Sequence, residues 1–260
     1  MSNEALRHTY YNIADGVLAF STTRHGGISE DNYASFNINP YCGDKPEHVA
    51  ENRCRLAAEL GIDADRIILP HQTHGVETRI VDAELLTQPL SVRQMRLEGV
   101  DALLTDVRGV CIGVSTADCI PVLLYDAEHH AAAAIHAGWR GTLARIVTKT
   151  LTDMRLAYQT DPKKLKAVIG PGISQKNFEV GDEVYNAFEE AAFPMDRLAV
   201  REKKWHIDLK LANRLLLTQA GVAEENIYQS DICTYDATDN YFSARRIGIN
   251  SGRIYTGIVL

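Results

Sequence analysis

The sequence lacks the cysteine pattern of a secreted, disulfide-bonded protein. It has five cysteines in 260 residues, an odd number, and no two of them are spaced as Cys-x-x-Cys. Disulfide frameworks of secreted proteins use even numbers of cysteines at short, regular spacings. We therefore expect free thiols and a cytoplasmic protein.

Long apolar segments, basic runs and low-complexity tracts are also missing. The most apolar stretch, 109–125, is interrupted by polar residues and a proline, so we expect no membrane-spanning helix. The net charge of −7, without clustered lysine or arginine, argues against nucleic acid and anionic membranes as partners. Because no linker or repeat divides the chain, we expect one domain over 1–260. We expect a monomer or homodimer whose partner is a small-molecule substrate.

Apolar periodicity and glycine turns predict a central group of strands with helices towards both ends. This order favours a mixed α+β fold over regular βαβ alternation. The strands on either side of the His71–Gly75 turn are expected to pair, and Asp44 can cap the first helix. The expected strands are 17–22, 66–69, 77–81, 102–104, 110–114, 122–125, 131–135, 167–169 and 254–259, and the expected helices are 46–60, 141–158, 182–193 and 208–220.

Three short segments carry soft metal ligands beside glycine turns. They are His-Gln-Thr-His-Gly at 71–75, Ala-Asp-Cys at 117–119 and His-Ala-Gly-Trp-Arg-Gly at 136–141. Two imidazoles and one thiolate, from His74, Cys119 and His136, suit Zn²⁺ and leave a fourth coordination position for water or substrate. Since an open position is typical of catalytic zinc, the sequence favours an enzyme.

Each of these side chains also has an ordinary structural explanation. Most free cysteines are small buried thiols, and a histidine in a turn is often only a polar surface group. The spacing matches no compact zinc signature, and His71 and His25 are rival ligands. The shared position beside glycine turns nevertheless favours a metal site.

Three arginines are candidates for binding phosphate, because guanidinium groups match phosphate oxygens. Arg24 and Arg140 lie in glycine turns, and Arg53 lies in the first expected helix. By base rate each is a solvated surface residue. Asn37 could hydrogen-bond a sugar or a base, or only shape its own loop.

These motifs resemble the YfiH family, whose members are called laccase-domain proteins, polyphenol oxidases or purine nucleoside phosphorylases. The resemblance extends over nearly the whole chain, and its most specific motif is the one at 136–141. Other matching motifs are Thr-Arg-His-Gly-Gly at 23–27, Ser-Phe-Asn-Ile-Asn at 35–39, Gln-Thr-His-Gly at 72–75, Asp-Ala-Leu-Leu-Thr at 101–105 and Ala-Asp-Cys-Ile-Pro at 117–121.

The resemblance implies a four-layer α/β/β/α sandwich, a fold shared with toxin deamidases of the CNF type, with the site at one edge. It implies zinc bound by His74, Cys119 and His136. It also implies phosphorolysis of adenosine, inosine and methylthioadenosine to free base and ribose 1-phosphate, together with deamination of adenosine.

For this chemistry we assign roles to further residues. Asp118, or alternatively Glu77, would move a proton during deamination, in which water activated by zinc attacks the purine C6. Arg24 and Arg140 would hold phosphate in line with the ribose C1′. The substrate would be bound by Asn37, Arg53 and His25.

Three alternatives remain open at the level of sequence. A metal-free cysteine hydrolase, for example one that edits cell-wall precursors, would use Cys119 as nucleophile and His136 as base. A zinc-stabilised interaction module would have a closed, four-ligand site. A multicopper oxidase is disfavoured because the nine histidines include no His-x-His pair, although one copper ion could occupy the His₂Cys site.

Overall fold

Two β-sheets pack face to face in the computed structural model, which describes residues 5–260. The first sheet has the strand order β1-β2-β14-β6-β3 and the second the order β13-β9-β7-β8-β5-β4, while β10, β12 and β11 form a small third sheet. The strands of the first sheet are β1 His8–Ala14, β2 Val17–Thr22, β14 Ile254–Val259, β6 Cys111–Thr116 and β3 Ile67–Ile68. Those of the second sheet are β13 Ile227–Gln229, β9 Lys166–Ile169, β7 Ile120–Asp126, β8 Ala131–Ala137, β5 Ala102–Thr105 and β4 Thr78–Ile80. The third sheet comprises β10 Glu179–Val180, β12 Trp205–Ile207 and β11 Ala199–Arg201.

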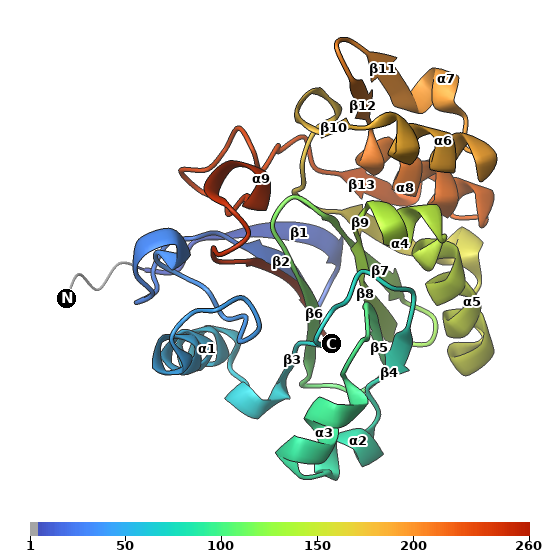
Figure 1. Cartoon of the computed structure of the whole chain (residues 1–260). Coiled ribbons are helices and arrows are strands. Elements are labelled where there is room, and N and C mark those ends of the chain that lie inside the picture. The colour runs from blue at the N-terminus through green and yellow to red at the C-terminus, as the bar shows by residue number, and fades with distance from the viewer. Residues whose placement is uncertain (1–4) are drawn as a thin grey trace.

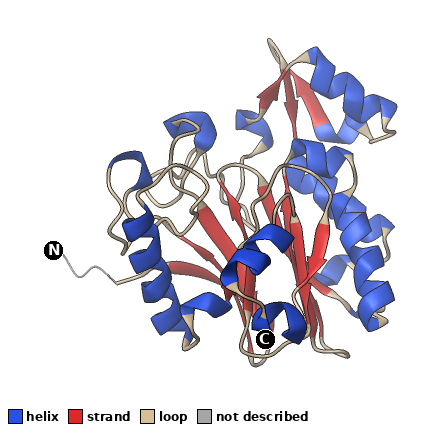
Figure 2. Ribbon diagram, turned by 60° about the horizontal axis from the view of Figure 1, so that its bottom comes forward, coloured by secondary structure: helices blue, strands red, loops and turns tan. Residues whose placement is uncertain are grey.

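Helices lie on both outer sides of the paired sheets (Figures 1 and 2). In Figure 1, α1 lies to the left of the sheets and α4, α5 and α8 lie to the right. This arrangement confirms the expected four-layer α/β/β/α sandwich. The helices are α1 Pro46–Leu60, α2 Ala83–Thr87, α3 Leu90–Arg96, α4 Trp139–Leu143, α5 Ile146–Tyr158, α6 Asp182–Glu190, α7 Met195–Leu198, α8 Leu209–Gln219 and α9 Ala244–Ile247.

Strand β8 shows why the second sheet lies in the middle of the molecule. Every residue of Ala131–Ala137 is buried, and alternate side chains face opposite layers. Ala133 and Ile135 belong to the cluster under the helices, while Ala132 and Ala134 pack with residues of the first sheet. A strand buried on both faces has a continuous apolar sequence, as β8 has, rather than an alternating one.

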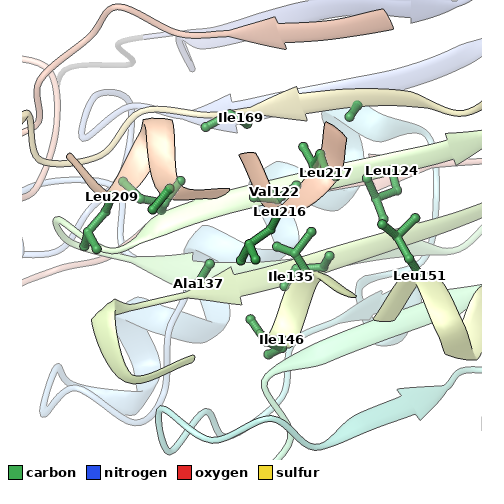
Figure 3. Packing of buried hydrophobic residues seen from close by; sticks show 14 of the residues in the cluster. Val122, Leu124, Ile135, Ala137, Ile146, Leu151, Ile169, Leu209, Leu216 and Leu217 are labelled. Carbon is green, nitrogen blue, oxygen red and sulfur yellow. The ribbon is translucent and has the colours of Figure 1, made fainter. Parts of the chain in front are cut away.

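The helical layers are held by apolar contacts with the sheets. In Figure 3, side chains of α5 and α8 such as Ile146 and Leu216 pack against Val122 and Ile135 of the second sheet. On the opposite side, Leu56 of α1 packs in a cluster with residues of the first sheet. The sheets are therefore enclosed on both sides, and their strand ends have fixed positions.

One expected pairing was wrong, and the difference positions a ligand. The strands on either side of the His71–Gly75 turn do not form a hairpin. Instead, β3 pairs in parallel with β6 in the first sheet, and β4 pairs in parallel with β5 in the second. The segment 69–77 therefore crosses from one sheet to the other, and His74 lies on this crossing.

Two helix predictions also need correction. Asp44 does not cap α1, because its carboxylate accepts hydrogen bonds from the Ser29 hydroxyl and the Asn37 amide instead. The helix expected over 141–158 is broken at Arg145, whose φ of +60° separates α4 from α5. Within residues 5–260, none of the helices has both the length and the apolar character needed to cross a membrane.

Candidate metal centre

His74, Cys119 and His136 meet at the edge where the two sheets adjoin. His74 lies on the crossing segment, Cys119 lies between β6 and β7, and His136 is near the end of β8. One nitrogen from each imidazole and the Cys119 Sγ all lie within 4.8 Å of one another. Across residues 5–260, this is the one group of three or more His, Cys, Asp or Glu side chains that could hold a metal ion.

A buried carboxylate that the sequence analysis did not single out holds two of these ligands. Asp101, just before β5, is fully buried, and its Oδ1 lies 2.7 Å from Nδ1 of His136. It also accepts hydrogen bonds from the backbone N–H groups of Thr73, His74 and Gly75 at 3.2, 3.0 and 2.8 Å. Because Nδ1 of His136 donates to Asp101, Nε2 is left to bind a metal.

The electrostatics of the group prepare the thiol to act as a ligand. Burial alone would raise the pKa of Cys119, but the charges and hydrogen bonds of His136 and His74 outweigh it and lower the pKa to about 6. Burial would lower the pKa of His136, but Cys119 and Asp101 raise it to about 9. Both shifts favour a thiolate on Cys119 and a proton on His136 when no metal is bound. A divalent cation would replace the proton on His136.

The space around the three ligands fits a single ion. A tetrahedral zinc site places ligand atoms about 3.5 Å apart, and the three ligand atoms here lie within 4.8 Å of one another. Gly138 keeps this space open. A Cβ atom at this position would lie 3.0 Å from the Cys119 Sγ and 3.1 Å from Cδ2 of His74.

The group opens into a cavity of about 520 Å³. His71 lines this cavity but is not one of the ligand group, because its Nδ1 lies 2.7 Å from the Glu98 carboxylate. The Tyr41 ring stacks on His71 with 4.3 Å between centroids. Asp118, Arg245 and Arg253 also contribute to the lining.

The two arginines expected to bind phosphate lie elsewhere. Arg24 donates from Nε to the Ala34 carbonyl at 2.7 Å and from a terminal nitrogen to the Thr238 carbonyl at 2.8 Å. Arg140 is exposed on α4, and its guanidinium lies 4.2 Å from the centroid of the Trp139 ring. Neither residue belongs to the cavity lining.

The three expected substrate-binding residues are likewise outside the lining. Arg53 donates to the backbone carbonyls of Ala64 and Ile67, which ties α1 to the start of β3. The His25 ring lies 3.0 Å from the Asn240 side-chain oxygen.

Asn37 is fully buried. Its side chain donates to the Asp44 carboxylate and accepts from the backbone N–H of Arg253. It therefore shapes a loop, which is one of the two roles that the sequence allowed.

Comparison with known proteins identifies the family of the chain. A family model described as "Multi-copper polyphenol oxidoreductase laccase" matches residues 18–260. The chain belongs to this family. A purine nucleoside phosphorylase of Bacteroides thetaiotaomicron is 47% identical over 93% of this chain and 90% of its own length.

Two further relatives support the assignment. A protein named adenosine deaminase RL5, from an unknown prokaryotic organism, is 43% identical over 94% of both chains. The crystal structure of YlmD from Geobacillus stearothermophilus superposes with a TM-score of 0.87 at 32% identity, covering 94% of this chain and 92% of that one. The protein is thus an enzyme of a family whose members process purine nucleosides.

The family description names several copper ions, whereas the residues that the structure describes offer ligands for one metal ion. A multicopper centre needs several ligand groups, and residues 5–260 place one such group together. The donor set is two imidazoles and one thiolate with room for a further ligand, which suits one zinc or one copper ion.

Replacing Gly138 with alanine should weaken metal binding while the fold survives. The added methyl group would press on the Cys119 Sγ and on His74. Overpacking of this kind costs about 1–3 kcal/mol, which would correspond to roughly a 5- to 150-fold loss of metal affinity. Competition with a zinc chelator measures the change.

Gly75→Ala is the matched control, since its Cβ would meet Asp101 only at 3.4 Å, an ordinary contact. Unchanged affinity in Gly138→Ala would show that the ion does not sit where the three side chains converge.

Asp101→Asn should reduce metal affinity by roughly 10- to 100-fold, because a carboxylate that orients a ligating histidine contributes about this much. It should also destabilise the metal-free protein, since an amide cannot accept all four hydrogen bonds. Chelator competition and thermal melting measure the two effects.

Asp126→Asn is a suitable comparison. Asp126 is also buried, and it also accepts from two backbone N–H groups and lies beside a histidine Nδ1, but at the far end of β7. It should lower stability and leave metal affinity intact. An equal loss of metal affinity in both variants would mean that Asp101 acts only on stability.

Proposed function

We propose that this protein is a zinc-dependent purine nucleoside phosphorylase with a second activity as an adenosine deaminase. Its substrates would be adenosine, inosine and methylthioadenosine, and it would release free base and ribose 1-phosphate. One observation carries the proposal: His74, Cys119 and His136 converge at a cavity whose volume, about 520 Å³, is usual for small-molecule sites. The similarity to named nucleoside enzymes supports it.

Zinc is the ion that best fits the ligands. The fixed tautomer of His136 and the lowered pKa of the Cys119 thiol favour binding of a divalent cation of any kind. Three protein ligands with an open fourth position are typical of catalytic zinc in particular. When bound, zinc acts as a Lewis acid and lowers the pKa of coordinated water towards neutrality. Since all five cysteines are free, we place the enzyme in a reducing compartment, the cytoplasm.

Phosphorolysis requires the protein to align two substrates. A phosphate oxygen forms a bond to the ribose C1′, and the C1′–N9 bond breaks with its electron pair moving to the base, which takes up a proton. Because the cavity is lined by residues at strand ends and in loops, it can hold both reactants in a fixed orientation, and this orientation lowers the barrier.

Deamination requires a proton carrier near the purine C6. The oxygen of water bonds to C6, and ammonia leaves after a proton has moved to the amino group. Asp118 is the carboxylate of the cavity lining, whereas Glu77 is exposed and does not belong to that lining. Asp118 is therefore our candidate for moving the proton.

A metal-free cysteine hydrolase is a second candidate, favoured by one specific observation. Asp101, His136 and Cys119 are arranged one after the other in space, with the carboxylate bound to Nδ1 of the imidazole and the thiol on the other side of the ring. Thiol hydrolases arrange an orienting acid, a base and a nucleophile in this order. Metal content and activity together separate the two functions.

The protein purified without chelators should contain about one zinc per chain, and Cys119→Ser should lose most of it. A serine hydroxyl stays protonated near neutral pH and is a poor zinc ligand. Both nucleoside activities should be lost while the melting temperature of the metal-free protein changes little. Elemental analysis, product chromatography with adenosine and inosine, and thermal melting measure these effects.

Cys54→Ser, an exposed cysteine of α1, is the control and should behave as the wild type. Loss of activity with normal zinc content in Cys119→Ser would favour the cysteine hydrolase. Full activity with normal zinc would contradict both candidates.

A further inference from the structure

The proposed phosphorylase must bind phosphate, yet neither arginine expected from the sequence lines the cavity. Two other arginines do. Arg245 and Arg253 come from the segment around α9 (red in Figure 1), and both belong to the lining that includes the three metal ligands. We propose that Arg245 and Arg253 form the site for the phosphate co-substrate.

Arg245 is held at the cavity by the loop that carries Cys119. Its backbone N–H donates to the Asp118 carboxylate at 2.7 Å, and the same carboxylate accepts from the Thr234 hydroxyl at 2.8 Å. The guanidinium donates from one terminal nitrogen to the Glu179 carbonyl and lies 5.6 Å from the Phe178 ring centroid. Its Nε and second terminal nitrogen remain available to a ligand.

Arg253 is fixed from a different direction. Its backbone N–H donates to the side-chain oxygen of the fully buried Asn37 at 3.1 Å. Its terminal nitrogens bind backbone carbonyls of its own loop, among them Ile249 at 2.9 Å and Gly252 at 3.0 Å. These bonds hold the planar group in one orientation and leave Nε and part of one terminal nitrogen for an anion. A guanidinium fixed in this way loses little entropy on binding phosphate.

The charges of the site favour an anion. The Asp118 carboxylate and a Cys119 thiolate together balance a divalent ion at the ligand group, and His71 is paired with Glu98. The Asp101 carboxylate on His136 offsets one of the two guanidinium charges, so the site keeps a net positive charge. Inorganic phosphate at neutral pH carries between one and two negative charges, and guanidinium groups bind its oxygens through charge-assisted hydrogen bonds.

This site gives Asn37 and Asp118 a common role. Both residues lie in the motifs singled out in the sequence, and each holds the backbone of one arginine. They are positioning residues for the phosphate site, and Asp118 in addition presents its carboxylate to the cavity.

The inference rests on the proposed function, so its test combines kinetics with direct binding. Arg245→Gln and Arg253→Gln should each raise the KM for inorganic phosphate about tenfold or more in inosine phosphorolysis, and should reduce phosphorolysis more than adenosine deamination. Arg245→Lys should recover part of the lost phosphate binding, because lysine restores the positive charge but not the two parallel N–H donors of the guanidinium group. Arg246→Gln is the matched control, since Arg246 is exposed beside Arg245 but does not line the cavity.

Calorimetric titration of the zinc-loaded proteins with inorganic phosphate supplies a readout that needs no turnover. Both Gln variants should bind phosphate at least about tenfold more weakly than the wild type and Arg246→Gln. Phosphate binding that depends on the arginines, in a wild type that turns over no nucleoside, would refute the proposed function and retain the anion site.

Two outcomes would overturn the inference while leaving the enzyme function intact. One is an unchanged KM for phosphate in both Gln variants with active phosphorolysis. The other is that the Gln variants lose affinity for adenosine 5′-monophosphate but not for inorganic phosphate, which would assign the arginines to the phosphate group of a nucleotide. Thermal melting confirms that each variant is folded, and because the two arginines are held by different residues, each variant is an independent test.

Discussion

The buried carboxylate of Asp101 is the interaction on which the metal centre depends. It joins β5, β8 and the segment that crosses between the sheets, through one imidazole and three backbone N–H groups. A fully buried carboxylate is costly unless it is hydrogen-bonded, and four donors offset that cost. The same bonds fix the tautomer of His136 and the backbone of His74, so two of the three ligands are oriented by one side chain.

The sheets make this arrangement rigid. Because β3 and β4 belong to different sheets, the crossing segment between them has both ends fixed by strand pairing. The second sheet is buried on both faces, which keeps the ends of β7 and β8, and thus Cys119 and His136, at a fixed separation. Sites built on such elements hold their geometry better than sites on free loops. The geometry of the candidate metal centre therefore follows from the packing of the sandwich.

Much of the fold could be predicted from local sequence patterns, since buried strands such as β8 and the amphipathic helix α1 carry clear signals. The strands around His71–Gly75 could not be paired correctly, because two short strands separated by a turn also suit a hairpin, and only their parallel partners decide between the two. The ligand group was predictable because soft donors beside glycines are unusual. Asp101 begins the matching motif at 101–105, but its role was not predictable, since an aspartate before a strand is a common turn residue and only its buried contact with His136 reveals that role.

The arginines show that a residue type in a conspicuous motif does not fix where its side chain lies. Arg24 and Arg140 lie in conspicuous glycine turns, but their guanidinium groups serve backbone carbonyls and an aromatic ring. Arg245 and Arg253 lie in a C-terminal segment to which the sequence analysis assigned no role, and long-range hydrogen bonds from their backbone N–H groups to Asp118 and Asn37 bring them to the cavity. A sequence motif can therefore matter through the distant residue that it positions.

The two proposed reactions take place at opposite ends of the nucleoside. Deamination occurs at C6 of the purine, whereas phosphorolysis occurs at C1′ of the ribose, so one ion cannot contact both reacting carbons in a single binding pose. In the proposed function the ligand group serves both reactions, so it cannot by itself decide between them. Which reaction takes place must depend on the remaining lining of the cavity. There Tyr41 stacks on His71 in the N-terminal half of the chain, and Arg245 and Arg253 come from its C-terminal end. Differences in specificity between relatives should accordingly arise in these loops, which can vary without disturbing the bonds of Asp101.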